Sequence, residues 1–420
     1  MEYIIIGASA AGLACAAEIR NTDPKGTITI LTKEGYEPYS RPSISYYLKG
    51  KVTENDMLLK KSAFYKANNI KIETNAEVTA IDKKAKTVKA GKKSYKYDKL
   101  CLCTGSVPFT VPVDNIKNKT NVFTFLDLES TKKIKQFADE NKKAVVIGAG
   151  LIGMKAAEGL SKICKSVDVV ELSDRILPSI LDDDASKMAK KHLEAHGIKF
   201  HLGTTVKSVN KDTAKIKSVT LQDGTVIPCD MLIQAVGVRP ATALAEKAEL
   251  EVNRGIITNP ETMQTSDADI YAAGDCCVSV DMLDGNKKII ALWPNAVLQG
   301  KVAGSQMAGG ELTVGGTYSV NAIDFYGLRI CTCGLINAKG EEYKNIIIKD
   351  ESKYKKLCVR DNKLVGFVLI NNSDNAGIYT DLIAKSVDLT TLQGDIKDTP
   401  SIFLFDKETR INKLRGGATL

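Results

Sequence analysis

Two glycine-rich turns are the sequence features whose residue types and spacing most directly predict chemistry. One of them reads G-x-G-x-x-G over residues 148–153, directly after the apolar run Lys143–Ile147. Its first glycine permits a tight turn, its second lets the backbone approach a pyrophosphate, and its third lets a helix pack closely on a strand. The segment therefore predicts a strand, a turn and a helix that together bind a dinucleotide.

An acidic residue follows this turn at the spacing expected of a nucleotide site. Glu171 ends the next apolar run, Val167–Val170. A carboxylate at this place accepts hydrogen bonds from the adenosine ribose and repels a 2′-phosphate, so the sequence favours NADH over NADPH. The residues of this unit that we expect to contact the nucleotide are Gly148, Gly150, Leu151, Ile152, Gly153 and Glu171.

A related turn lies near the beginning of the chain. It follows the apolar run Tyr3–Ile6, and Ser9 stands where the second glycine is usual. Glu34 lies about 22 residues after Gly12, a spacing that suits an acid bonded to a ribose. A tight turn without a ligand is the alternative interpretation. The residues expected to contact a second dinucleotide are Gly7, Ser9, Ala10, Ala11, Gly12 and Glu34.

Composition limits the class of protein. The 420 residues are enough for two or three domains, and no apolar run is long enough to span a bilayer. Ten cysteines without a C-x-x-C spacing indicate reduced thiols, and hence a cytoplasmic protein. The net charge of +8 comes mostly from dispersed lysines, which favours a solvated surface over a nucleic-acid site. A basic face for an acidic protein partner is the alternative.

Neither the histidines nor the paired cysteines predict a metal site. His192 and His196 have i, i+4 spacing but lack the glutamate of an H-E-x-x-H motif, so we expect a surface pair. The adjacent Cys276 and Cys277 are expected to be small buried residues, because a disulfide between neighbours is strained.

The elements that must position these residues can be placed along the chain. Buried strands lead to Thr104-Gly105, to Ala235-Val236-Gly237 and to Gly274-Asp275. Helices are predicted over Leu177–His196 and Trp293–Ala308, and alternating strands from about residue 317 onward. This order of elements predicts an α/β protein with parallel sheets.

These landmarks, taken in order, resemble the FAD-dependent pyridine nucleotide-disulfide oxidoreductase family. The resemblance implies an α/β fold with two Rossmann-like dinucleotide-binding domains and a C-terminal α+β interface domain. It places the FAD-binding domain at residues 1–113 and 241–315, the inserted NAD-binding domain at 114–240 and the interface domain at 316–420. It also implies FAD and NAD as cofactors, and it makes a homodimer possible.

The resemblance assigns further roles to individual residues. Asp275 would bind the ribityl chain of the flavin, and Glu34 the adenosine ribose. The remaining residues that the resemblance implies in cofactor binding are Arg41, Pro42, Thr104, Gly105, Gly237 and Gly274.

The branch of the family is indicated by a loop and by missing residues. No cysteine lies between Cys15 and Cys101, and Ala10 occupies the place of the histidine found in oxidase and peroxidase members. Residues 38–45 resemble the P-Y-x-R-P-x-x-S loop of ferredoxin, rubredoxin and nitrite reductase-type flavoproteins. That branch passes electrons from NADH through FAD to an iron-sulfur protein, which is the activity we expect.

Two departures from this branch concern the flavin. Relatives often carry a lysine where this chain has Tyr46 and a glutamate where it has Lys155, and the two can form an ion pair near the flavin ring. We expect Lys155 to lie near the flavin as a catalytic cation whose contacts differ from that pair; a solvated helix lysine is the alternative. The functional alternatives are an NADH oxidase or peroxidase and a flavin-bound scaffold that senses NADH.

Overall fold

The computed structural model describes residues 1–211, 213–398 and 400–414, and the chain divides into two compact units. The first unit comprises Met1–Gly148, Ile152–Val169 and Val206–Tyr318. The second comprises Ala149–Leu151, Val170–Thr205 and Ser319–Leu420. The three domain ranges expected from the sequence stay a prediction.

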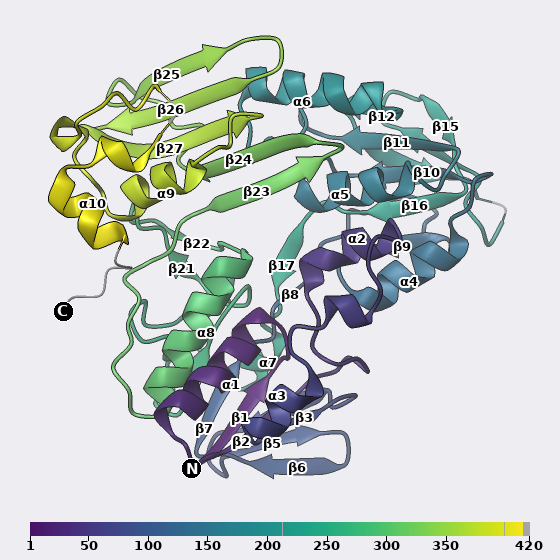
Figure 1. Ribbon diagram of the computed structural model, residues 1–420. Coiled ribbons are helices and arrows are strands. Elements are labelled where there is room, and N and C mark those ends of the chain that lie inside the picture. Colours follow the sequence, from purple (N-terminus) through teal and green to yellow (C-terminus); the bar gives the residue numbers. More distant parts are fainter. Residues whose placement is uncertain (212, 399, 415–420) are drawn as a thin grey trace. The chain divides into compact units, whose positions relative to one another are not determined.

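A five-stranded parallel sheet forms the core around the N-terminal turn (Figure 1). Its strands, in spatial order, are β20 (Ile270–Ala272), β7 (Lys99–Leu102), β1 (Glu2–Ile6), β2 (Thr27–Leu31) and β3 (Ile70–Glu73). Tyr3 and Ile5 point into one apolar cluster, and Ile4 and Ile6 into another. The continuous apolar run of β1 is thus explained by burial on both faces.

Helices α1 (Ala10–Thr22) and α8 (Trp293–Met307) lie side by side on one face of this sheet (Figure 1). Their backbones approach closely because glycines face α1. A Cβ at Gly300 would lie 2.2 Å from the Ala11 carbonyl oxygen, and one at Gly304 would lie 2.4 Å from that of Cys15. The bounds of α8 confirm the predicted helix Trp293–Ala308 to within one residue. It packs against α1, the helix that follows the first glycine-rich turn.

The second turn follows a strand of another parallel sheet. β10 (Lys143–Ile147) pairs with β16 (Met231–Gln234), which pairs with β9 (Val122–Thr124). Helix α4 (Leu128–Phe137) follows β9, and α5 (Leu151–Leu160) follows the turn after β10. Asp127 caps α4, because its carboxylate accepts a hydrogen bond from the Ser130 amide at 2.8 Å.

Smaller elements complete the first unit. The antiparallel sheets are β4 (Val78–Asp82), β5 (Thr87–Ala90) and β6 (Lys93–Lys96), and β13 (Val206–Val209), β14 (Ser218–Leu221) and β15 (Val226–Pro228). The two-stranded pairs are β8 (Ser106–Pro108) with β17 (Val238–Pro240), β18 (Val252–Asn253) with β19 (Gly255–Ile256), and β21 (Ser279–Val280) with β22 (Lys287–Lys288). The short helices are α2 (Ile44–Leu48), α3 (Ser62–Ala67) and α7 (Ala243–Lys247).

The second unit contains an antiparallel sheet, as the alternating pattern after residue 317 predicts. Its order is β23 (Val320–Phe325), β24 (Leu328–Gly334), β27 (Lys363–Ile370), β26 (Tyr354–Arg360) and β25 (Lys344–Lys349). Helix α9 (Ala376–Ala384) packs on β24 and β27, and α10 (Lys407–Leu414) follows near the end of the chain. Strand β11 (Ser166–Glu171) runs into this unit, and β12 (Ile198–Leu202) belongs to it.

The helix expected over Leu177–His196 is wrong at its beginning. Helix α6 spans Asp183–Ala195, because Leu177 has a positive φ of 50° and Asp182 is the N-cap. The Asp182 carboxylate accepts a hydrogen bond from the Ala185 amide at 3.1 Å.

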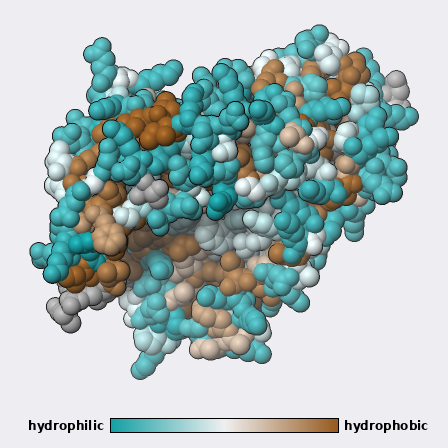
Figure 2. Space-filling view, turned by 45° about the horizontal axis from the view of Figure 1, so that its top comes forward, coloured by the Kyte–Doolittle hydropathy of each residue, from teal (hydrophilic) through white to brown (hydrophobic). Residues whose placement is uncertain are grey.

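Charged and polar side chains dominate the face of the molecule shown in Figure 2, with smaller hydrophobic patches between them. Among the helices of the described residues, none has the length and apolarity that crossing a membrane requires.

Candidate functional site

The two glycine-rich turns have closely similar geometry. Gly7 and Gly148, the first glycines, have φ values of +115° and +103°. A Cβ at Gly12 would lie 1.9 Å from the Gly7 carbonyl oxygen, and one at Gly153 would lie 2.0 Å from that of Gly148. A side chain at Gly12 or Gly153 would force the backbone to shift, so the close packing predicted from each glycine pattern is present, and Ser9 does not disturb the first turn.

The N-terminal ends of α1 and α5 are suited to binding an anion. Neither α1 nor α5 carries an acidic residue in its first turn, as far as the described residues go, and no side chain among them caps α1 at Ser9. Amide groups at a helix N-terminus attract negative charge, and each glycine-rich turn leads directly into such an N-terminus. The two turns therefore fit the pyrophosphates of two dinucleotides, with Ala10 and Ala11 in the first turn of α1 and Leu151 and Ile152 in that of α5.

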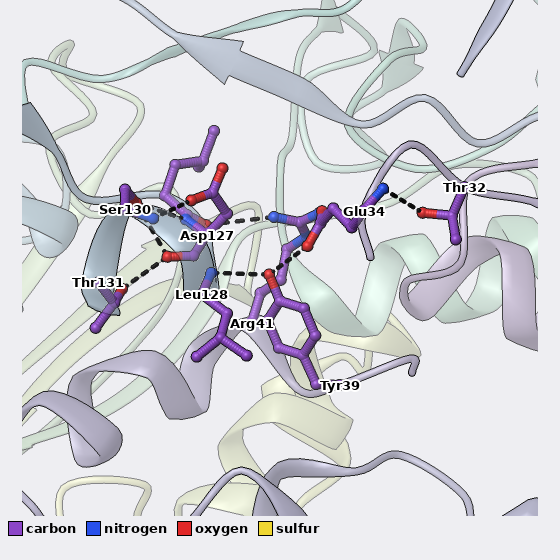
Figure 3. Close-up of polar contacts among 9 residues, drawn as sticks. Thr32, Glu34, Tyr39, Arg41, Asp127, Leu128, Ser130 and Thr131 are labelled. Carbon is purple, nitrogen blue, oxygen red and sulfur yellow. Dashed lines mark hydrogen bonds and ion pairs between the residues drawn. The ribbon is translucent and has the colours of Figure 1, made fainter. Parts of the chain in front are cut away.

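Glu34 is held by two neighbouring side chains (Figure 3). The Arg41 guanidinium pairs with one carboxylate oxygen, and the Tyr39 hydroxyl donates a hydrogen bond of 2.7 Å to the other. Arg41 also donates to the Leu126 carbonyl oxygen at 3.4 Å. Burial raises the pKa of Tyr39 well above its ordinary value, so the hydroxyl keeps its proton. Pro42 follows Arg41 in a single turn of 3-10 helix.

Asp275 lies at the carboxyl end of β20, directly after Gly274. Its carboxylate accepts a hydrogen bond of 3.3 Å from the Ser106 hydroxyl. Burial raises the pKa of Asp275, although the Ser106 hydrogen bond and the charge of Arg41 oppose that rise. Arg41 thus lies within electrostatic range of both Asp275 and Glu34, the two carboxylates expected at the two sugar parts of FAD.

Sequence reasoning missed Gln299, which fixes the turn before Asp275. Its side-chain oxygen accepts a hydrogen bond from the Gly274 amide at 2.9 Å, and its amide nitrogen donates to the Ser279 hydroxyl at 2.7 Å. The signal that could have revealed Gln299 is its place as a polar residue on the apolar face of the predicted helix Trp293–Ala308.

Thr104 and Gly105 stand at the end of the neighbouring strand β7. The Thr104 hydroxyl donates to the Ala241 carbonyl oxygen at 2.8 Å, and Gly105 has a positive φ of 68°. The Ala241 amide donates back to the Gly105 carbonyl oxygen at 2.9 Å. These bonds join the two segments expected to form the FAD domain, and Gly237 lies nearby along the chain with a φ of +116°.

The carboxylate of Glu171 is positioned against the second turn. One oxygen accepts a hydrogen bond from the Ala149 amide at 2.6 Å, and the other accepts one from the Ser173 amide at 2.8 Å. Each oxygen keeps further lone pairs for ribose hydroxyls. A Cβ at Gly150 would meet no described atom within 4 Å, so space is open beside the turn.

Lys155 belongs to a buried charge cluster rather than a solvated helix face. Its ammonium and that of Lys49 contact the same carboxylate oxygen of Glu158, at 2.8 and 2.5 Å. The side chains of Lys155, Lys49 and Glu158 are 17%, 7% and 5% exposed. Burial raises the pKa of Glu158, but the hydrogen bonds from the two lysines outweigh it and hold that pKa below its ordinary value.

The aromatic ring of Tyr46 lies beside both cations of this cluster. The Lys155 and Lys49 ammonium groups are 5.7 and 5.5 Å from its centroid, within cation–π range. In relatives an ion pair can join the positions of Tyr46 and Lys155. Here an ion pair joins Lys49 and Glu158, each three residues later in the chain. Sequence reasoning missed Lys49 and Glu158, because no local pattern pairs two residues that lie so far apart in the chain.

The adjacent cysteines take the structural role expected of them, whereas the expected surface pair of histidines is only partly correct, since His196 is exposed and His192 is half buried. Cys276 and Cys277 are fully buried, as the prediction of small core residues requires. The His192 ring nitrogen lies 3.0 Å from the Phe325 carbonyl oxygen, and the His196 ring stacks on that of Tyr326 with centroids 4.2 Å apart.

Comparisons with known proteins agree with this geometry. The family model described as pyridine nucleotide-disulphide oxidoreductase matches residues 1–300, and the one described as rubredoxin NAD+ reductase C-terminal domain matches residues 320–387. NADH oxidase of Methanocaldococcus jannaschii is 38% identical over 74% of this chain and 71% of its own length. Rubredoxin-NAD(+) reductase of Pseudomonas putida is 31% identical over 74% of this chain and 80% of its own length.

A solved structure confirms the fold class. The putidaredoxin reductase in its covalent complex with putidaredoxin superposes with a TM-score of 0.85 and 25% identity, covering 99% of this chain and 98% of that one. The α/β fold with two Rossmann-like dinucleotide-binding domains and a further C-terminal domain, expected from the sequence, is therefore correct.

Proposed function

Because the chain belongs to the pyridine nucleotide-disulphide oxidoreductase family, with FAD and NAD as its cofactors, we propose that it passes electrons from NADH to a small iron-sulfur protein. The observation that carries this proposal is the presence of two equivalent dinucleotide turns in a chain whose C-terminal part matches the rubredoxin NAD+ reductase domain. A cytoplasmic location and a homodimer through residues 316–420 are parts of the same proposal; the ten free cysteines support the former.

The chain's own residues would bind and orient the two cofactors. When bound, FAD accepts a hydride from NADH and gives up its electrons one at a time. Such a reaction needs positioning more than acid or base groups. The turn at Gly7 and the carboxylates of Glu34 and Asp275 would hold FAD, and the turn at Gly148 with Glu171 would hold NAD.

Sulfur chemistry has little support in the proposed flavin loop. That loop carries Arg41, Pro42 and Ser43 and no cysteine, and Cys101 and Cys103, at the end of β7 and directly after it, are buried. Hydrogen bonding between these two thiols and burial raise the pKa of Cys103 well above its ordinary value, so it stays protonated. A protonated, buried thiol is a poor nucleophile, which favours transfer of electrons to an external carrier.

An oxidase is the second candidate, because the relative that is 38% identical is named NADH oxidase. The two activities are separated by measuring NADH consumption with oxygen alone and with rubredoxin or a ferredoxin added. We expect the carrier to accelerate turnover at least about tenfold over oxygen. Equal rates with and without every carrier would favour the oxidase. Rates near zero in all cases would favour the flavin-bound NADH sensor.

We further propose that Glu171 sets a preference for NADH. Replacing Glu171 with glutamine should raise the dissociation constant for NADH about tenfold, since hydrogen bonds to a charged group contribute about 1.5–3 kcal/mol. The dissociation constant for NADPH should change little or fall, because the carboxylate no longer repels its 2′-phosphate. Titration of the two nucleotides checks this, with Glu194→Gln on α6 as the control. An unchanged NADH to NADPH ratio would contradict the assignment.

We also propose that Lys155 stabilises the negative charge of reduced FAD. Lys155→Met should lower the midpoint potential of the flavin by about 30 mV, equivalent to about 1.4 kcal/mol for two electrons. Glu158 keeps its contact with Lys49 in this variant, so the protein should still fold. Spectroelectrochemical titration checks the shift, and Lys155→Arg should restore most of it. A methionine variant with the wild-type potential would place Lys155 away from the flavin.

A further inference from the structure

We propose that Tyr39 is a positioning residue that orients Glu34 toward the adenosine ribose of FAD and links that site to the first turn of α4. The inference rests on the proposed role of Glu34 as the ribose ligand. The Tyr39 hydroxyl would not touch the reacting atoms of the flavin. It would instead connect the proposed FAD site with α4, the helix that follows strand β9.

The Tyr39 hydroxyl lies between two partners (Figure 3). It is 2.7 Å from a carboxylate oxygen of Glu34 and 3.0 Å from the amide nitrogen of Leu128. The amide can only donate, so the hydroxyl oxygen accepts from Leu128 and its single proton must be donated to Glu34. The direction of both hydrogen bonds is therefore fixed, and the Tyr39 proton points to one oxygen of Glu34.

The first turn of α4 has one of its amides bonded to this hydroxyl. Leu128 is its first residue and is 2% exposed, so its amide would be costly to leave without an acceptor. The Asp127 side chain serves the Ser130 amide instead. Tyr39 supplies the acceptor for Leu128 and is itself 6% exposed, so water has little access to replace it.

Arg41 forms a second link parallel to the first. It pairs with the other oxygen of Glu34 and donates to the Leu126 carbonyl oxygen. The two links differ in how a ligand would affect them. Arg41 can exchange Glu34 for a nearby phosphate, because a guanidinium binds either anion well, whereas a neutral tyrosine has no such alternative. We infer that Glu34 gives up Arg41 and keeps Tyr39 when it binds the ribose.

The matched substitutions are Tyr39→Phe and Tyr36→Phe. Both remove one hydroxyl that contacts the α4 region, since the Tyr36 hydroxyl donates to Glu129 at 2.6 Å. Only Tyr39 also contacts Glu34. Apoprotein of each variant is titrated with FAD and with FMN, which lacks the adenosine ribose, and binding is followed by flavin fluorescence.

We expect Tyr39→Phe to raise the dissociation constant for FAD about tenfold, to leave that for FMN unchanged, and Tyr36→Phe to behave like the wild type for both. An unchanged FAD constant in Tyr39→Phe, or equal losses for FAD and FMN, would overturn the inference. A Glu34→Gln variant distinguishes the proposed role of Glu34 as ribose ligand from the positioning role of Tyr39. If it leaves FAD binding unchanged, the ribose assignment itself is wrong; if it weakens FAD binding while Tyr39→Phe does not, only the role of Tyr39 is lost.

The wild-type protein provides a second test that does not depend on a variant folding. FAD should slow hydrogen exchange at the Leu128 amide more than at the Ile134 amide farther along α4. Equal effects at the two amides would contradict the link. None of these measurements involves NADH or an electron acceptor, so their failure would leave the proposed electron transfer untouched.

Discussion

A Gly153→Ala variant should bind FAD normally yet be reduced by NADH about 100-fold more slowly than the wild type, because displacements of about 1 Å at a positioned substrate cost that much. The added Cβ would lie 2.0 Å from the Gly148 carbonyl oxygen, and a backbone atom cannot move aside as a flexible side chain can. The turn and the start of α5 must therefore shift. The first turn, at Gly7, is formed by a separate strand and helix and should be unaffected.

Flavin absorbance gives the FAD content of this variant, and anaerobic mixing with NADH gives the rate of reduction. Dithionite should still reduce the flavin fully. Gly150→Ala is the matched structural control, since a Cβ there meets no described atom within 4 Å and should leave the thermal unfolding temperature unchanged. A Gly153→Ala protein reduced by NADH at the wild-type rate would contradict the assignment of the second turn.

Glu158→Gln should lower the free energy of unfolding by about 3 kcal/mol, the cost of breaking a buried ion pair by removing one of its charges. Lys49 and Lys155, at 7% and 17% side-chain exposure, would then lose the carboxylate that they share. The control is Glu194→Gln, which breaks an exposed pair with Lys190 and should cost less than about 1 kcal/mol. Urea unfolding of the three proteins gives the comparison. Equal losses in both variants would contradict a stabilising role for the buried cluster.

The difference in stability between the wild type and Glu158→Gln should depend on pH. The pKa of Glu158 is lower in the folded protein than its ordinary value, so the ionised form stabilises the fold. That contribution is fully present above about pH 4.5 and is lost as the pH falls through the folded pKa. Wild type and Glu158→Gln should therefore differ most near neutral pH and converge in acid. A difference that stays constant down to pH 3 would contradict this origin.

Local patterns could be predicted from the sequence, and contacts between distant segments could not. The two turns were predictable because Gly7 and Gly148 need a backbone conformation that other residues avoid, and this need appears in the glycine spacing itself. The place of Glu171 followed from the length of one strand–helix–strand unit. These features depend on neighbours in the sequence.

The charge cluster and the Tyr39 link depend instead on tertiary packing. Lys49 and Glu158 are separated by more than a hundred residues, and nothing local pairs them. Tyr39 and Leu128 meet because the fold brings the loop that carries Tyr39 against the first turn of α4. The start of α6 was mispredicted for a related reason, since the apolar residues after Leu177 fit a helical period although the chain turns there.

The most direct test of electron transfer from NADH to an iron-sulfur protein is anaerobic stopped-flow spectroscopy of the FAD-bound protein, mixed first with NADH and then with oxidised rubredoxin or ferredoxin. The proposed function predicts rapid bleaching of the flavin by NADH, slower bleaching by NADPH, and recovery of the oxidised flavin spectrum as one carrier is reduced. A flavin that NADH leaves oxidised, or one that NADH reduces and no carrier reoxidises, would contradict it.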